Sequence, residues 1–191
     1  MKNVFILLTL LFTFSVQAEV YKAKFGLSKL VIDGDSSVHK WKVETKVIGG
    51  FLSVDAASLG KTGTTDAKGK VIVPVRQLKS GKKRMDEVMH AAMNEPKHKL
   101  IDFTITSLEI DSTKDDVAKG TGKGSIKING VTKPLTLDVS ITQKGSHLTV
   151  SGTTPLKMTD FGIKPPSPKL PTGSIKTNPE VKISFDWIVV K

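Results

Sequence analysis

The chain of 191 residues contains no cysteine. Disulfide bonds, thiol catalysis, iron–sulfur clusters and cysteine-rich zinc sites are therefore excluded. A fold without disulfides must be held together by packing alone. A single domain of this length buries roughly 70% of the surface that its unfolded chain exposes, which is enough for a hydrophobic core.

Arginine and aromatic residues are scarce as well. The chain has a formal charge of +11, and Arg76 and Arg84 are the only arginines among its 29 basic residues. Arginine is the residue that recognises phosphates and base edges through its planar fork, so this composition argues against a nucleic-acid partner. A surface dominated by lysine favours solubility and weak contact with an anionic membrane or envelope surface.

Long hydrophobic runs are absent except at the N-terminus. Lys2 precedes the apolar run VFILLTLLFTFSV, and a small-residue site follows at Val16-Gln17-Ala18. The run is shorter than the roughly 20 apolar residues of a membrane span. This order predicts a secretory signal peptide, residues 1–18, cleaved after Ala18, and one domain, residues 19–191. The protein is expected to be periplasmic or secreted, and the sequence does not choose between these.

Catalytic and metal-binding patterns are also missing. The chain has four histidines: His39, His90, His98 and His147. None is paired at the spacing of a zinc site, which needs about four well-placed ligands. Asp35, Ser36 and Ser37 lie near His39, but no nucleophile elbow accompanies them and this composition is typical of a turn. We therefore predict a protein that is not an enzyme, with no catalytic residue, no metal and no cofactor.

Alternating apolar and polar residues, typical of half-buried strands, run through most of the chain. The segment PLTLDVSI, residues 134–141, is one clear case, and VKISFDWIVV, residues 181–190, is another. Turn signals such as Asp33-Gly34-Asp35 and Asn129-Gly130 separate these runs. Strands without regularly intervening helices predict an all-β, antiparallel barrel or sandwich of about eight strands.

One segment, residues 80–96, has the pattern of an amphipathic helix. Ser80 is its expected N-cap and Pro96 limits its continuation. Met85, Met89 and Met93 fall at i, i+4 and i+8, which forms an apolar stripe. Methionine adapts to irregular apolar partners, so the stripe indicates either ordinary core or contact with a changeable apolar ligand.

Residues 163–180 form a second unusual segment, because they contain five prolines. Proline fixes φ and removes an amide donor, so the segment is expected to be extended, stiff and outside the sheet. It is either a lid over a barrel mouth or a simple connection between two strands.

Four segments in sequence resemble the YceI-like family of exported, lipocalin-like, polyisoprenoid-binding proteins. They are VIDGDSSVHKWKVETKVIGGF, LKSGKKRMDEVMHAAMNEPKHKLIDFTITSLEI, GKGSIKINGVTKPLTLDVSI and LTVSGTTPLKMTDFGI. The resemblance implies an antiparallel eight-stranded lipocalin-like barrel with one short amphipathic helix. It also implies a polyisoprenoid or similar amphiphilic lipid in the apolar interior, and a carrier, storage or stress role. The chain departs from the family at Ala91-Ala92-Met93, where many members have paired phenylalanines, which leaves the length and identity of the ligand open.

The candidate ligand-binding residues are the large apolar side chains expected on the inner strand faces, on the helix and at the barrel mouth. They are Trp41, Met85, Met89, Met93, Phe103, Ile105, Leu135, Leu137, Val139, Leu156, Met158, Phe161, Phe185 and Trp187. Alternation does not distinguish a ligand-binding wall from a filled core. The alternative function is therefore a solid-cored envelope binding or structural protein that acts through its basic surface. The sequence also leaves open whether the protein forms a homodimer.

Overall fold

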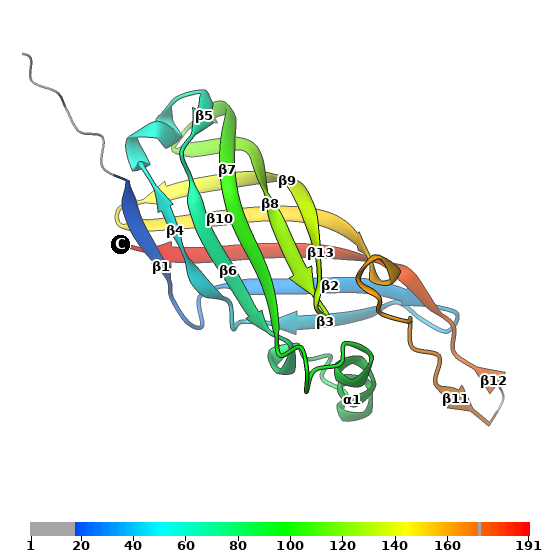
Figure 1. Ribbon diagram of the computed structural model, residues 1–191. Helices are drawn as coiled ribbons and strands as arrows, with labels where there is room; N and C mark the ends of the chain where they lie inside the picture. The colour runs from blue at the N-terminus through cyan, green and yellow to red at the C-terminus, as the bar shows by residue number, and fades with distance from the viewer. Residues whose placement is uncertain (1–17, 172) are drawn as a thin grey trace, which may run out of the picture.

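The computed structural model describes residues 18–171 and 173–191 (Figure 1). The expected signal peptide, apart from Ala18, lies outside the described residues. Across the described ranges, no helix is long and apolar enough to cross a membrane.

The chain forms long strands with one α-helix. The strands are β1 (Glu19–Ala23), β2 (Lys29–Ser36), β3 (Trp41–Thr45), β4 (Gly49–Val54), β5 (Gly63–Thr65), β6 (Lys68–Pro74), β7 (Leu100–Lys114), β8 (Val117–Ile128), β9 (Val131–Lys144), β10 (His147–Lys157), β11 (Lys169–Leu170), β12 (Gly173–Ser174) and β13 (Thr177–Val190). The helices are α1 (Lys83–Ala92) and the short 3₁₀ turns η1 (Ala56–Gly60), η2 (Val75–Gln77) and η3 (Met158–Phe161).

The strands close into an antiparallel barrel. Neighbours follow the order β1, β4, β6, β7, β8, β9, β10 and β13, and β13 pairs back with β1. Strand β2 extends the line of β1, because β13 pairs with β1 through Val189 and Val190 and with β2 through residues 177–186. The closed eight-stranded barrel with one helix confirms the predicted fold class. A closed barrel leaves its interior lined by every second residue of each strand.

Two-residue hairpin turns connect the consecutive strands β7, β8, β9 and β10. Asn129 and Gly130, with φ of 49° and 80°, join β8 to β9 as predicted. Positive φ at both central residues is the geometry of the tight hairpin turn that Asn-Gly favours. The predicted turn at Asp33-Gly34-Asp35 is wrong, because these residues lie inside β2. Gly34 is needed there for a different reason, since the indole ring of Trp41 lies over it.

The core consists of inward-facing side chains in two adjoining clusters. The larger includes Tyr21, Val43, Leu148 and Trp187, each at most 2% exposed. The smaller lies against α1 and η3 and consists of Ile126, Ile128, Phe161 and Ile163. Methionines 85, 89 and 93 are only half-buried, and none of the ten residues of α1 is fully buried.

Helix α1 is shorter than the predicted segment, residues 80–96. Its N-cap is Lys82, which makes no capping side-chain bond, so the prediction of Ser80 as N-cap is wrong. The hydroxyl of Ser80 instead donates to Asp86 at 2.6 Å. The helix ends before Asn94, whose φ of 50° does not continue a right-handed helix.

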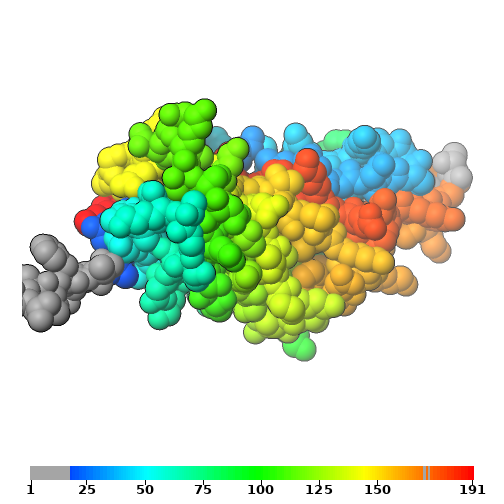
Figure 2. Space-filling view, turned by 90° about the horizontal axis from the view of Figure 1, so that it is seen from above, coloured from blue at the N-terminus to red at the C-terminus, as the bar shows by residue number. Residues whose placement is uncertain are grey.

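The proline-rich segment crosses the same end of the barrel as α1. Its central part forms the hairpin β11–β12, and its last four residues, 177–180, already belong to β13. Figure 1 places α1 and this hairpin toward one end of the barrel, away from β1 and the C-terminal residue. Figure 2 shows β2 and β3 lying beside the first half of β13 at that end, in agreement with their pairing.

Candidate ligand-binding cavity

Two adjacent cavities lie within the barrel. The mouth cavity, at the end that carries α1, has a volume of about 700 Å³. The inner cavity, deeper in the barrel, has a volume of about 130 Å³. Six residues line both: Leu30, Val73, Ile101, Ile126, Leu156 and Ile183. The two cavities therefore adjoin each other, and the side chains that they share are all apolar.

The inner cavity is lined by apolar side chains, with Thr154 contributing its single hydroxyl. That hydroxyl donates to the carbonyl of Pro155 at 3.4 Å. Trp187 also lines this cavity, and its Nε1 is buried without a hydrogen-bond partner among the described residues. No charged side chain of the described residues reaches the inner cavity. An ion would lose its hydration there without compensation, so the inner cavity suits a hydrocarbon.

The mouth cavity is enclosed on one side by α1. Met85, Met89 and Met93 line it together with Val88 and Ala92, which follows from their spacing along one helical face. Unbranched, polarisable side chains can follow the shape of a flexible hydrocarbon.

The proline-rich segment also lines the mouth cavity, through Pro166, Pro168 and Ile175. The hydroxyl of Thr177 donates to the carbonyl of Pro166 at 2.6 Å, and the amide of Ile175 donates to Pro168 at 3.0 Å. The segment is thus a structured wall of the cavity, which is more than a connection between strands. Two bonds with Ser37 hold Lys176 against the β2–β3 turn.

All fourteen predicted ligand-binding residues line at least one of the two cavities. The mouth cavity contacts Trp41, Met85, Met89, Met93, Leu156, Met158 and Phe161. The inner cavity contacts Phe103, Ile105, Leu135, Leu137, Val139, Leu156, Phe185 and Trp187. The structure thus brings these residues together around one space, and their binding of a ligand stays a prediction.

Sequence reasoning missed a second set of lining residues, mostly aliphatic. They include Leu30, Ile32, Val73, Ile101, Ile126, Ile163, Val181 and Ile183. The same alternation that marked their larger neighbours could have identified most of them. Pro166 and Pro168 carried no such signal, because their position depends on how the segment folds back over the barrel end.

Three aromatic rings near the cavities lie over glycines of neighbouring strands. A Cβ added at Gly34 would come within 2.1 Å of the Trp41 ring, and one at Gly152 within 2.7 Å of the Phe185 ring. At Gly124 the ring of Phe103 would be 3.0 Å away. Glycine leaves room for these rings to lie flat against the wall of the barrel.

Polar contacts between Ser80 and Asp86 hold the start of helix α1 against the segment that precedes it. The backbone amide and the hydroxyl of Ser80 donate to Asp86 Oδ1 at 2.7 and 2.6 Å. Burial alone would raise the pKa of the Asp86 carboxyl. The two bonds from Ser80 and the charges of Lys79 and His90 outweigh burial and lower this pKa below its ordinary value.

Two further contacts hold the end of the helix and the segment after it. His90 Nε2 lies 3.0 Å from the carbonyl oxygen of Leu78. The guanidinium of Arg76 lies 3.1 Å from the largely buried carboxylate of Glu95. These contacts set the helix across the barrel end without filling the space beneath it.

The polar rim of the mouth cavity is basic. Ser36 and Thr177 line it from the strands and His39 from the β2–β3 turn, and the charged lining residues are Lys82, Arg84, Lys157 and Lys169. No aspartate or glutamate of the described residues lines this cavity. No group of three or more possible metal ligands occurs in the described parts of the chain.

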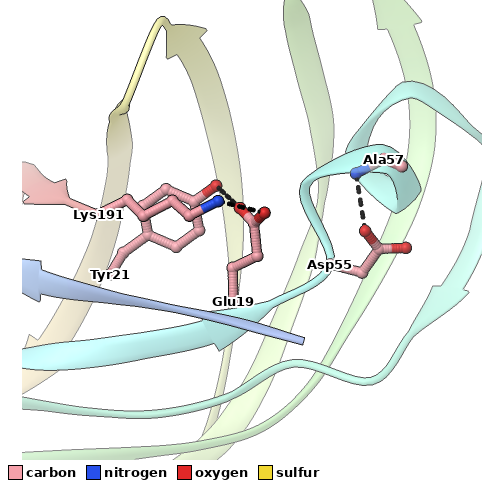
Figure 3. Close-up of polar contacts among 5 residues, drawn as sticks. All are labelled: Glu19, Tyr21, Asp55, Ala57 and Lys191. Atoms are coloured by element: carbon pink, nitrogen blue, oxygen red, sulfur yellow. Dashed lines mark hydrogen bonds and ion pairs between the residues drawn. The ribbon is translucent and has the colours of Figure 1, made fainter. Parts of the chain in front are cut away.

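A polar network around Glu19 lies at the opposite end of the barrel (Figure 3). The hydroxyl of Tyr21 donates to Glu19 Oε2 at 2.7 Å, and the ammonium of Lys191 donates to Oε1. Burial raises the pKa of Tyr21 to about 12, and the hydrogen bond to Glu19 adds to this effect. The bond from Lys191 lowers the pKa of Glu19. Nearby, Asp55 caps η1 by accepting from the amide of Ala57 at 3.0 Å.

Comparisons with known proteins agree with this architecture. BcnA of Burkholderia cenocepacia is 17% identical, with a TM-score of 0.69 over 87% of this chain and 98% of its own. A polyisoprenoid binding domain from Saccharophagus degradans, implicated in plant cell wall breakdown, is 9% identical, with a TM-score of 0.68 over 89% and 97% of the two chains. At such identities the likeness shows the fold alone.

No curated protein matches the chain. The model of the YceI-like domain matches residues 13–188, which span nearly the whole sequence. The chain therefore belongs to the YceI-like family.

Proposed function

We propose that this protein binds a polyisoprenoid or similar amphiphilic lipid with its hydrocarbon inside the barrel. The observation that carries the proposal is the mouth cavity of about 700 Å³, which adjoins an apolar inner cavity. Ligand sites in proteins are mostly apolar and measure about 300–1,000 Å³. The similarity in fold to a domain described as polyisoprenoid binding supports the same class of ligand.

The proposed role is binding, as a carrier, a store or a stress protein, and not catalysis. The side chains around the inner cavity offer no nucleophile with an adjacent base. Methionines 85, 89 and 93 on α1 would adapt to the ligand, whereas the barrel strands hold the remainder of the wall in place.

The proposal includes export to the periplasm or the exterior, for which the pattern of residues 1–18 is the support. The lysine-rich surface of the exported protein would make weak contact with anionic membranes or envelope polymers, from which the lipid would be taken. Such contact would weaken as the salt concentration increases.

A solid-cored envelope protein is the alternative, and it would require a filled interior. The two adjoining cavities favour the lipid-binding function over this alternative.

Native mass spectrometry tests the proposal on protein purified from a host that exports it. We expect a bound lipid that solvent extraction releases. Met89→Glu should abolish binding, because it places a carboxylate against the hydrocarbon in the mouth cavity. Leu100→Glu is the matched control, since Leu100 is 43% exposed and lines neither cavity.

Both variants must retain cooperative unfolding for the comparison to count. A wild-type protein that is purified empty and also fails to take up added polyprenyl alcohol would contradict the proposed function. Equal loss of lipid from both variants would contradict the assignment of the mouth cavity as the binding site.

A further inference from the structure

The turn between β1 and β2, residues 24–28, carries two large apolar side chains on the surface of the protein. Phe25 is 74% exposed and Leu27 is 50% exposed. Neither belongs to a hydrophobic cluster of the core, and neither lines one of the two cavities. Packing within the described chain therefore does not account for them, and an exposed apolar surface can mark a site of interaction.

The β1–β2 turn is held in place at both ends by one residue of β13. The backbone amide of Lys24 donates to the carbonyl of Ile188 at 3.2 Å, and the amide of Ile188 donates to the hydroxyl oxygen of Ser28 at 3.0 Å. Ser28 is buried, whereas a Cβ added at Gly26, in the middle of the turn, would meet nothing within 4 Å. The base of the turn is therefore fixed while its tip stands in open space.

Further apolar side chains adjoin the turn on the outer face of the barrel. Phe51 on β4 is 43% exposed and is the register partner of Lys22, which lies on β1 just before the turn. Val20 is 51% exposed and lies diagonally across from Phe51 on the same face. Four of the six large apolar side chains that are exposed in the described chain therefore lie on β1, the turn after it and β4.

The charges in and beside the turn are positive. Residues 20–32 include three lysines, Lys22, Lys24 and Lys29, and no acidic residue. Lys29 pairs with Glu44 on β3 at 3.5 Å. Lys22 and Lys24 are both exposed, so their ammonium groups stand beside the apolar tip.

The connection from β3 to β4 adds a further lysine. Leu30 pairs with Thr45, so Lys46 follows at the end of β3 that lies beside the start of β2 (Figure 1). Within the described ranges, the ammonium groups of Lys22, Lys24 and Lys46 are in no ion pair. An anionic surface would therefore attract this part of the protein.

A small apolar tip among like charges fits a lipid surface better than a protein partner. A stable protein interface buries about 1,200–2,000 Å² in total, which is more than the side chains of one turn supply. A second copy of the chain would bring the same lysines against one another, and they would repel. An anionic membrane attracts lysine and also takes apolar side chains into the region below its headgroups.

We propose that the β1–β2 turn docks the protein on membranes that contain anionic phospholipid. Phe25 and Leu27 enter the interfacial region of the membrane, and Lys22, Lys24 and Lys46 contact the phosphate groups around them. The proposal rests on the membrane contact included in the proposed function and assigns that contact to one segment. It requires no ligand inside the barrel, so docking and lipid binding can be tested separately.

Co-sedimentation with vesicles tests the proposal on the mature protein, residues 19–191. One set of vesicles contains phosphatidylethanolamine and phosphatidylglycerol, and the other contains phosphatidylcholine alone. We expect about tenfold weaker binding to the second set at low ionic strength, because it carries no net charge. The difference between the two sets should shrink as salt is added.

The double variant Phe25→Ser/Leu27→Ser tests the apolar tip. Binding to the anionic vesicles should weaken about tenfold, because the polar side chains gain nothing by leaving water. Phe25→Trp should retain binding, since tryptophan suits a membrane interface. The matched control is Val38→Ser/Leu100→Ser, which removes two exposed apolar side chains away from the turn and should bind as the wild type does. None of these four side chains belongs to a core cluster, so both double variants should fold.

A second double variant, Lys22→Glu/Lys24→Glu, tests the charges. It should lose most of the binding to the anionic vesicles. The matched control is Lys114→Glu/Lys144→Glu, which makes the same change in net charge at exposed positions outside the turn. This control should retain most of the binding, because its lysines do not face the membrane in the docked position.

A wild-type protein that binds neither set of vesicles but still takes up isoprenyl alcohol would overturn docking and leave the lipid-binding function standing. Undiminished vesicle binding by Phe25→Ser/Leu27→Ser would overturn the insertion of the turn. Equal losses in the two lysine variants would overturn its charge contacts, because net charge alone would then explain binding.

Two further outcomes separate docking from its alternatives. Met89→Glu should lose the isoprenyl alcohol and keep its binding to vesicles, since Met89 lines the mouth cavity and lies outside the turn. A dimer that depends on Phe25, in a protein that binds no vesicles, would overturn the membrane and identify a second copy of the chain as the partner.

Discussion

The indole ring of Trp41 on β3 lies directly over Gly34, its register partner on β2. A Cβ on residue 34 would come within 2.1 Å of the ring, so no other residue fits without displacing it. The ring is held further by a bond from its Nε1 to the carbonyl of Asp35 at 3.2 Å. The glycine thereby fixes one wall of the mouth cavity.

Gly34→Ala should therefore move the Trp41 ring and narrow the mouth cavity. Overpacking of this kind costs about 1–3 kcal/mol of unfolding free energy, measurable by urea denaturation. Affinity for an isoprenyl probe should fall as well. Gly60→Ala is the control, because a Cβ at Gly60 meets nothing within 4 Å. Unchanged stability and affinity in Gly34→Ala would show that the ring has another equally good position.

Tyr21 is the only tyrosine of the chain, so its ionisation can be followed directly by ultraviolet absorbance. We expect a single transition near pH 12 in the folded protein and one near the ordinary value of 10.0 after unfolding in urea. The folded state favours the neutral phenol, so the raised pKa of Tyr21 contributes to the stability of the fold. This contribution is complete below the pKa that Tyr21 has in the unfolded chain, and it is lost as the pH rises toward 12. A native transition near pH 10 would contradict the burial of the hydroxyl beside Glu19.

Glu19→Gln should bring the pKa of Tyr21 partly back toward its ordinary value. The negative charge beside the phenol is removed, whereas burial, the larger cause, remains. The variant should also lose part of the acid dependence of stability. Because the pKa of Glu19 is lowered in the folded state, its contribution to stability is present above its ordinary value of 4.5 and is lost as the pH falls through the folded-state value. Glu180→Gln, an exposed change on β13, should alter neither property.

Asp86→Ala should destabilise the protein by about 1–2 kcal/mol, because two hydrogen bonds from Ser80 to a charged acceptor are lost. Urea denaturation at neutral pH measures this loss. The difference in stability between the variant and the wild-type protein should shrink in acid. The lowered pKa of Asp86 stabilises the fold at pH values above the ordinary 3.8, and this contribution disappears as the pH falls below the folded-state pKa.

Glu87→Gln provides the comparison on the same helix. Glu87 and Arg84 form an exposed pair, which contributes at most about 1 kcal/mol. If both variants lost the same stability, the bonds between Ser80 and Asp86 would not be what holds the start of α1.

The strand pattern was predictable because a barrel wall imposes a period of two on its sequence. Leu135, Leu137 and Val139 were placed on the inner face by that period alone, and the methionine stripe was placed by the helical period. Neither period could distinguish a filled core from a cavity, because a filled core and a cavity wall require the same apolar side chains. Cavity volume depends on the packing of distant segments across the barrel.

The errors at Gly34 and Ser80 have a different origin. Both residues carry strong local signals, for a turn and for an N-cap, and tertiary contacts override each of them. The ring of Trp41 needs the space at Gly34, and the carboxylate of Asp86 accepts from the hydroxyl of Ser80. The basic rim of the mouth cavity was likewise not predictable from the sequence, because its lysines come from three separate elements.

Closure of the barrel by the pairing of β1 with β13 has a consequence for how the protein folds. The two strands come from opposite ends of the described chain and pair through Lys22 with Val190 and Ala23 with Val189. A pairing at such sequence separation loses much loop entropy before its contacts form, and topologies of this kind fold in milliseconds to seconds. The last strand must be available before the barrel can close, so a nascent chain that lacks β13 would expose unpaired edges at both β10 and β1.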